Sequence, residues 1–134
     1  MRFKTELLQA IRDGRKTVTR RLVKTEECTY KIGRIYQATN RPRFEASGMK
    51  ANVTGGWFSL PIKIVSVRRG RVGDITEDDA EKEGFEPHTV DYGACLSARD
   101  QFLILWGKIH GYDFPAPNPE IWRIEFQRVP ESWR

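Results

Sequence analysis

Cysteine and histidine are scarce in this chain, which has only two residues of each among its 134. Cys28 and Cys95 lie far apart and form no Cys-x-x-Cys pair, so the sequence supports neither a zinc site nor a redox dithiol. We expect two free thiols. His88 and His110 are isolated as well, and a lone histidine is usually a surface or capping residue rather than a metal ligand. We therefore expect no metal and no cofactor.

The chain also lacks an apolar run long enough to span a bilayer. Its first eight residues carry charges where a secretory signal would be apolar. We find no internal repeat, no linker and no long low-complexity stretch. These absences predict a single cytoplasmic domain over residues 1–134 that does not contact a membrane, and we expect a monomer or a weak dimer.

Positive charge is in excess, with a formal net charge of +5 and a pI near 9.4. A basic protein of this size favours an anionic partner, such as RNA, DNA or a nucleotide. The excess also promotes solubility, so it indicates a class of partner and not a particular ligand.

Capping residues and apolar spacing predict three short helices. The first has Thr5 as N-cap and ends near Gly14, and the second begins after the N-cap Thr76 and ends at Gly84. In the second helix Asp79 occupies the position of a capping-box carboxylate. The third runs from Ser97 to His110, and its stripe of Phe102, Leu105, Trp106 and Ile109 is typical of a core face.

Strands are predicted at residues 35–38, 57–60, 62–67 and 121–128, where apolar and polar residues alternate or apolar residues run together. Pro61 indicates an edge or a bulge. Loops are expected at 40–56 and in the proline-rich segment 111–119. Strands interspersed with three helices, without strict alternation, predict an α+β domain built on a small curved sheet or barrel.

Residues 14–21, Gly-Arg-Lys-Thr-Val-Thr-Arg-Arg, are the densest group of reactive side chains. Lys16 and Thr19 could present a base and a nucleophile to one small volume, provided that a turn or helical step separates them. The cations around Lys16, together with burial, would lower its pKa. The alternative is a solvated basic loop.

Glu83 lies at the end of its predicted helix, where the helix dipole disfavours a carboxylate. Its spacing from Ala80 directs it toward the buried face. Contact with Lys16 would make the two groups titrate as a pair. The alternative is an ordinary surface acid.

Three segments resemble the ASCH (activating signal cointegrator homology) domain family. These are Ile11-x-x-Gly14-Arg15-Lys16-Thr17-Val18-Thr19-x-Arg21, then Ile75-Thr76-Glu77-x-x-Ala80-x-x-Glu83-Gly84-Phe85, and finally Ile121-Trp122-Arg123-Ile124-Glu125-Phe126. The resemblance covers most of the chain. It implies a PUA-like fold, a small β-barrel flanked by short helices.

The resemblance also implies an activity. Small bacterial members of the family are amidohydrolases that release acetate from N(4)-acetylcytidine, and the residues matching their catalytic positions are Lys16 as base, Thr19 as nucleophile and Glu83 as proton relay. Other members are described as RNA-binding modules, and nuclease activity has been suggested for some. We expect a modified nucleoside or RNA as partner, with substrate contacts from Arg15, Thr17, Arg20, Arg21, Tyr36 and Trp57.

Overall fold

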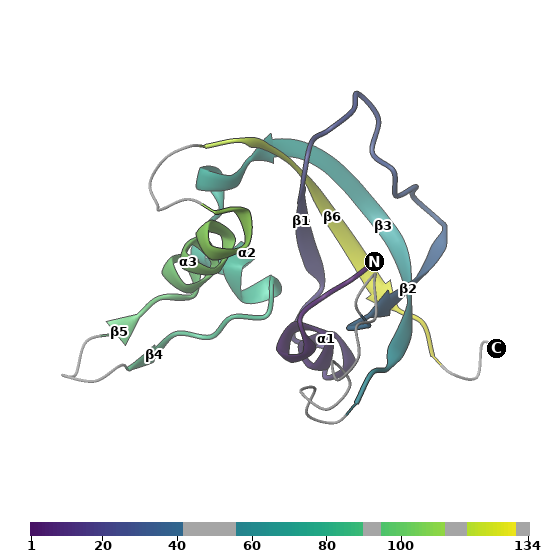
Figure 1. The fold of residues 1–134 in the computed structure, drawn as a ribbon, viewed down its shortest axis with the longest axis horizontal. Helices are drawn as coiled ribbons and strands as arrows, with labels where there is room; N and C mark the ends of the chain where they lie inside the picture. The colour runs from purple at the N-terminus through teal and green to yellow at the C-terminus, as the bar shows by residue number, and fades with distance from the viewer. Residues whose placement is uncertain (42–55, 90–94, 112–117, 131–134) are drawn as a thin grey trace.

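Four antiparallel strands form the main sheet, in the order β1-β6-β3-β2 (Figure 1). The strands are β1 (Val18–Leu22), β2 (Ile35–Thr39), β3 (Ser59–Arg71) and β6 (Glu120–Arg128), and a short hairpin pairs β4 (His88–Thr89) with β5 (Cys95–Leu96). The computed structural model describes residues 1–41, 56–89, 95–111 and 118–130, so most of the two predicted loops lies outside the described residues.

Three helices accompany the sheet: α1 (Thr5–Arg12), α2 (Glu77–Lys82) and α3 (Ala98–His110). The sheet curves strongly around α1, whereas α2 and α3 pack together to one side (Figure 1). A 3-10 turn, η2 (Val72–Asp74), follows β3. The predicted α+β class is confirmed. None of the described helices is long and apolar enough to cross a membrane.

The buried apolar residues fall into two clusters. One lies between α1 and the concave face of the sheet and includes Leu8, Ile11, Ile62, Ile64 and Phe126. The second joins α2 and α3 to the far ends of β3 and β6, and includes Val72, Ala80, Phe102, Leu103, Trp106 and Ile121.

Most predicted helix ends are confirmed. Ser97 accepts a hydrogen bond from the Asp100 amide and caps α3, which ends at Gly111 with a φ of +78°. Thr76 caps α2 in the same way. The prediction of Thr5 as an N-cap is wrong, because Thr5 is the first helical residue and its hydroxyl accepts a hydrogen bond from Asn40.

The strand predictions contain three errors. Residues 57–60 and 62–67 were expected as separate strands, but β3 runs unbroken through Pro61, whose carbonyl accepts the Val129 amide just past the end of β6. The bulge lies between Ile64 and Ser66 rather than at Pro61. Strand β1 was not predicted, and Thr19 lies within it, so no helical step separates Thr19 from Lys16.

Candidate functional site

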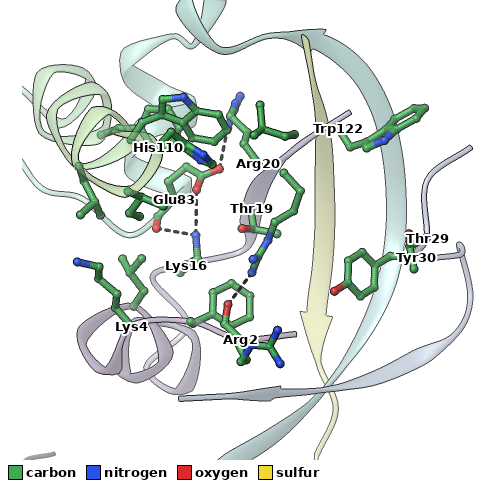
Figure 2. Close-up of a pocket in the computed structure, with 18 of the residues that line it drawn as sticks. Arg2, Lys4, Lys16, Thr19, Arg20, Thr29, Tyr30, Glu83, His110 and Trp122 are labelled. Carbon is green, nitrogen blue, oxygen red and sulfur yellow. Dashed lines mark hydrogen bonds and ion pairs between the residues drawn. The ribbon is translucent and has the colours of Figure 1, made fainter. Parts of the chain in front are cut away.

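A cavity of about 800 Å³ lies between α1 and α3, with β1 along its wall. Its volume is within the range of about 300–1,000 Å³ typical of small-molecule sites. The wall includes aromatic and aliphatic groups, among them Phe3, Tyr30, Phe102, Leu105, Trp106 and Ile109, and the cations Arg2, Lys4, Lys16, Arg20, Arg21 and Lys24. Figure 2 shows Lys16, Thr19 and Glu83 at its centre.

Lys16 directs its amino group into a set of three acceptors. Its Nζ lies 2.8 Å from the Val18 carbonyl oxygen, 3.0 Å from the Glu83 carbonyl oxygen and 2.9 Å from Glu83 Oε1. An ammonium has three N–H donors and no acceptor, so this geometry fits the charged form at rest. Burial nevertheless lowers the pKa of Lys16, and the Glu83 carboxylate opposes that effect. The amine is therefore held charged while burial makes its proton easier to remove.

Glu83 reaches Lys16 because the end of α2 packs closely on the chain that follows α1. The residue is only 3% exposed, and Gly84 after it has a φ of +107°. A Cβ at Gly84 would lie 3.2 Å from Ala10 Cβ and 3.3 Å from Lys16 Cβ, so glycine permits this approach. The Thr17 amide also donates to the Lys82 carbonyl at 2.8 Å. The expected turn of Glu83 toward the buried face is confirmed.

Arg20 links Glu83 to a second carboxylate. Its Nη1 lies 2.9 Å from Glu83 Oε2, and its Nη2 donates to Asp79 Oδ2. Arg123 also donates to Asp79, from Nε to Oδ2 at 2.9 Å and from Nη2 to Oδ1 at 3.1 Å. The carboxylate of Asp79 is therefore engaged by two arginines and does not complete the predicted capping box. The result is a chain of alternating charges from Lys16 to Arg123 that fastens α2 to β1 and β6.

Replacing Asp79 with asparagine should lower the free energy of unfolding at pH 7 by about 1–3 kcal/mol, because charge-assisted hydrogen bonds are lost. Hydrogen bonding to Arg123 lowers the pKa of Asp79 from 3.8 to about 2. A depressed carboxyl pKa contributes stability that is present above pH 4 and disappears as the pH falls toward 2. Urea unfolding from pH 7 to 3 should show wild type and Asp79→Asn converging at low pH. A difference that does not change with pH would contradict this assignment.

Thr19 is 5% exposed and lines the same cavity. In the part of the chain that the structure describes, its hydroxyl forms no hydrogen bond, and Lys16 donates to Glu83 and Val18 instead. The structure thus brings Lys16, Thr19 and Glu83 to one cavity without joining Lys16 to Thr19. Catalytic hydrogen bonds are often long or poorly aligned before substrate binds, so the absence of a Lys16–Thr19 hydrogen bond is compatible with Thr19 as nucleophile and Lys16 as its base.

The structure brings Arg20 and Arg21 to the cavity but not the other four residues predicted to contact substrate. Arg15 is exposed and pairs with Asp13 at 3.4 Å. Residues 15–17 lie in the connection between α1 and β1, and neither Arg15 nor Thr17 lines the cavity. The Tyr36 hydroxyl instead accepts the Lys31 amide, and Trp57 stacks with Arg41.

Three groups in the cavity wall were not anticipated. His110, expected at the surface, stacks on Trp106 with ring centroids 4.1 Å apart, and burial lowers its pKa. Tyr30 lies in the cavity wall and packs edge-on against Tyr36, which is not part of the wall. The α3 stripe expected in the core also lines the cavity, where Ile109 is 53% exposed. A helical stripe cannot by itself distinguish a core face from a cavity wall.

Among the described residues, no group of three histidine, cysteine, aspartate or glutamate side chains could hold a metal ion. Cys28, whose side chain is buried, is free and lines the cavity.

No protein-family model and no curated protein matches this chain. Among solved structures, protein EF3133 from Enterococcus faecalis V583, family-model DUF984, is similar with a TM-score of 0.55 and 19% identity. The match covers 92% of this chain and 66% of that one, just under two thirds. An ASCH domain from Lactobacillus crispatus JV V101 matches with a TM-score of 0.49 and 17% identity, over 91% and 69% of the two chains. The Enterococcus comparison shows a shared fold.

Proposed function

We propose that this protein is a metal-independent amidohydrolase that removes the acetyl group from N(4)-acetylcytidine or a related acylated pyrimidine nucleoside. The observation that supports it best is the buried Lys16–Glu83 pair, which lies with Thr19 in one cavity of small-molecule size. Buried titratable groups paired in a cavity are typical of catalytic sites. The flanking aromatic and aliphatic side chains suit a flat heterocycle.

In this mechanism the first step is a proton transfer from Lys16 to Glu83 across their 2.9 Å hydrogen bond. The neutral amine then accepts the Thr19 proton as the hydroxyl oxygen bonds to the acetyl carbon. When the carbon–nitrogen bond breaks, protonated Glu83 gives its proton to the departing amino group of cytidine. Lys16 and Glu83 are then a charged pair again, and water hydrolyses the acetyl ester on Thr19, which restores the hydroxyl and releases acetate and a proton.

Arg20 opposes the first step because its hydrogen bond to Glu83 favours the carboxylate. The same cation lowers the pKa of Lys16 by repulsion, as Arg21 does. The transfer therefore depends on the balance between these effects, and a substrate that expels water from the cavity shifts it toward the two neutral partners.

The reaction should slow at high pH, because a Lys16 that has lost its proton to solvent can no longer pass that proton to Glu83 for the departing amino group. Burial lowers the pKa of Lys16 from 10.5, so kcat/KM for N(4)-acetylcytidine should begin to fall below that pH. Removing a nearby cation in Arg21→Gln should move the inflection to higher pH. A rate that keeps rising over the same range would contradict the transfer of a proton from Lys16 to Glu83.

The activity itself is tested by incubating N(4)-acetylcytidine with the purified protein and separating the products by chromatography. Cytidine and acetate should appear in equal amounts and increase with enzyme concentration. Unchanged substrate would contradict the proposal.

A noncatalytic RNA-binding module is the second candidate, and the cations Arg2, Lys4 and Lys24 in the cavity wall favour it. It predicts binding of RNA without product, with an affinity that falls steeply as salt increases. A ribonuclease would instead shorten the RNA in the same incubation.

A further inference from the structure

Arg21 is a mostly buried cation whose guanidinium is only partly satisfied. Its Nη2 donates to the Arg2 carbonyl at 2.8 Å, and its Nε is buried without a hydrogen-bond partner. The Phe3 ring lies 4.8 Å from the guanidinium carbon. No carboxylate among the described residues forms an ion pair with Arg21, although a guanidinium carries five donors.

The neighbouring buried cations differ from Arg21. Lys16 and Arg20 both pair with Glu83, and Arg20 also pairs with Asp79. Buried charges in proteins are ordinarily paired, because an unpaired charge loses its hydration without compensation. Burial lowers the pKa of Arg21, and repulsion from Arg2 adds to this effect. The chain thus supplies counterions for the two buried cations, Lys16 and Arg20, and leaves the partly buried Arg21 without one.

The wall of the cavity that Arg21 lines carries further positive charges. Arg2, Lys4 and Lys24 line the same cavity, and none of them pairs with a carboxylate in the described segments. Arg2 and Lys4 lie at the α1 end of the cavity, on the side toward Lys16 (Figure 2). Glu27 also lines the wall, but its carboxylate faces Lys31 at 3.4 Å. An uncharged nucleoside would leave all of these cations uncompensated.

We propose that Arg21 binds the phosphate of the substrate, which makes the substrate class an acylated pyrimidine nucleotide rather than the free nucleoside. The proposal rests on the function proposed above. A phosphate accepts parallel hydrogen bonds from a guanidinium, and its charge would neutralise Arg21 together with Arg2. The phosphate could belong to a free mononucleotide or to an RNA strand, since both present the same group.

Isothermal titration calorimetry with the two expected products, cytidine and cytidine 5′-monophosphate, tests this proposal without requiring catalysis. Wild type should bind cytidine 5′-monophosphate about tenfold more tightly than cytidine, as one charge-assisted contact predicts. Arg21→Gln should remove the difference, and Arg21→Lys should retain part of it. Arg68→Gln, which changes an exposed arginine of β3 outside the cavity, should behave as wild type. Equal binding of the two products by wild type would overturn the proposal, as would a preference that persists in Arg21→Gln.

A short oligonucleotide with one cytidine identifies the source of the phosphate. If the oligonucleotide binds as tightly as cytidine 5′-monophosphate, the phosphate belongs to an RNA strand. If it binds more weakly, the phosphate belongs to the free nucleotide. Either result supports the proposal when Arg21→Gln abolishes the tighter binding relative to cytidine. The product assay on uncharged N(4)-acetylcytidine tests the amidohydrolase activity separately from the phosphate-binding role of Arg21. Turnover of the nucleoside combined with equal binding of both products would overturn the phosphate subsite and retain the amidohydrolase.

Discussion

Replacing Lys16 with methionine should lower kcat/KM for N(4)-acetylcytidine by at least about 10²-fold, the usual effect of removing a proton-transfer group. Methionine is close to lysine in length and fills the buried site without an amine, so Thr19 keeps its place but loses its base. Glu83 keeps Arg20 as a counterion at 2.9 Å, which limits the loss of stability. The measurement is initial-rate chromatography of cytidine release.

The matched control for this variant is Lys63→Met, which changes an exposed lysine on β3 and should leave turnover unchanged. Thermal unfolding of Lys16→Met should show a cooperative transition, which establishes that the protein still folds. Turnover at the wild-type rate in a folded Lys16→Met protein would rule out Lys16 as the base.

Glu83→Gln should lower the free energy of unfolding by about 3–5 kcal/mol, the typical cost of removing one partner from a buried ion pair. Glu83 is the only carboxylate among the described residues that pairs with Lys16, and it also pairs with Arg20. A neutral amide would leave Lys16 buried without a counterion. Urea unfolding at pH 7 measures the loss, which should exceed that of Lys16→Met.

The double variant Lys16→Met/Glu83→Gln provides the control for this effect. If the loss arises from an uncompensated charge on Lys16, removing that charge as well should restore part of the stability, giving a coupling free energy in a double-mutant cycle. Losses that simply add would show that the pair is not coupled, and a Glu83→Gln protein as stable as wild type would contradict its role as buried counterion.

The sequence predicted the helices well because their ends depend on local chemistry. Ser97 and Thr76 cap α3 and α2 through their own hydroxyls, and Gly111 ends α3 in the left-handed conformation. Such signals lie within a few residues of the feature that they mark. Thr5 failed as a cap because its hydroxyl accepts a hydrogen bond from Asn40, a partner remote in sequence.

Strand β1 could not be found in the same way, because Thr-Arg-Arg does not resemble a buried strand. Arg20 is buried there only because Asp79 on α2 and Glu83 at the C-cap of α2 neutralise it. The sequence singled out Lys16, Thr19 and Glu83 as reactive groups, but not the arginine network that joins them. His110 and Arg2 reach the cavity wall only through tertiary packing, which spacing along the chain does not encode.

The most direct test is a crystal structure of the protein with cytidine, the expected product. Bound cytidine should lie in the cavity between α1 and α3 with its exocyclic amino group within hydrogen-bonding distance of Lys16, Glu83 or Thr19. Cytidine bound elsewhere, or a cavity that stays empty at saturating cytidine, would contradict the proposed site.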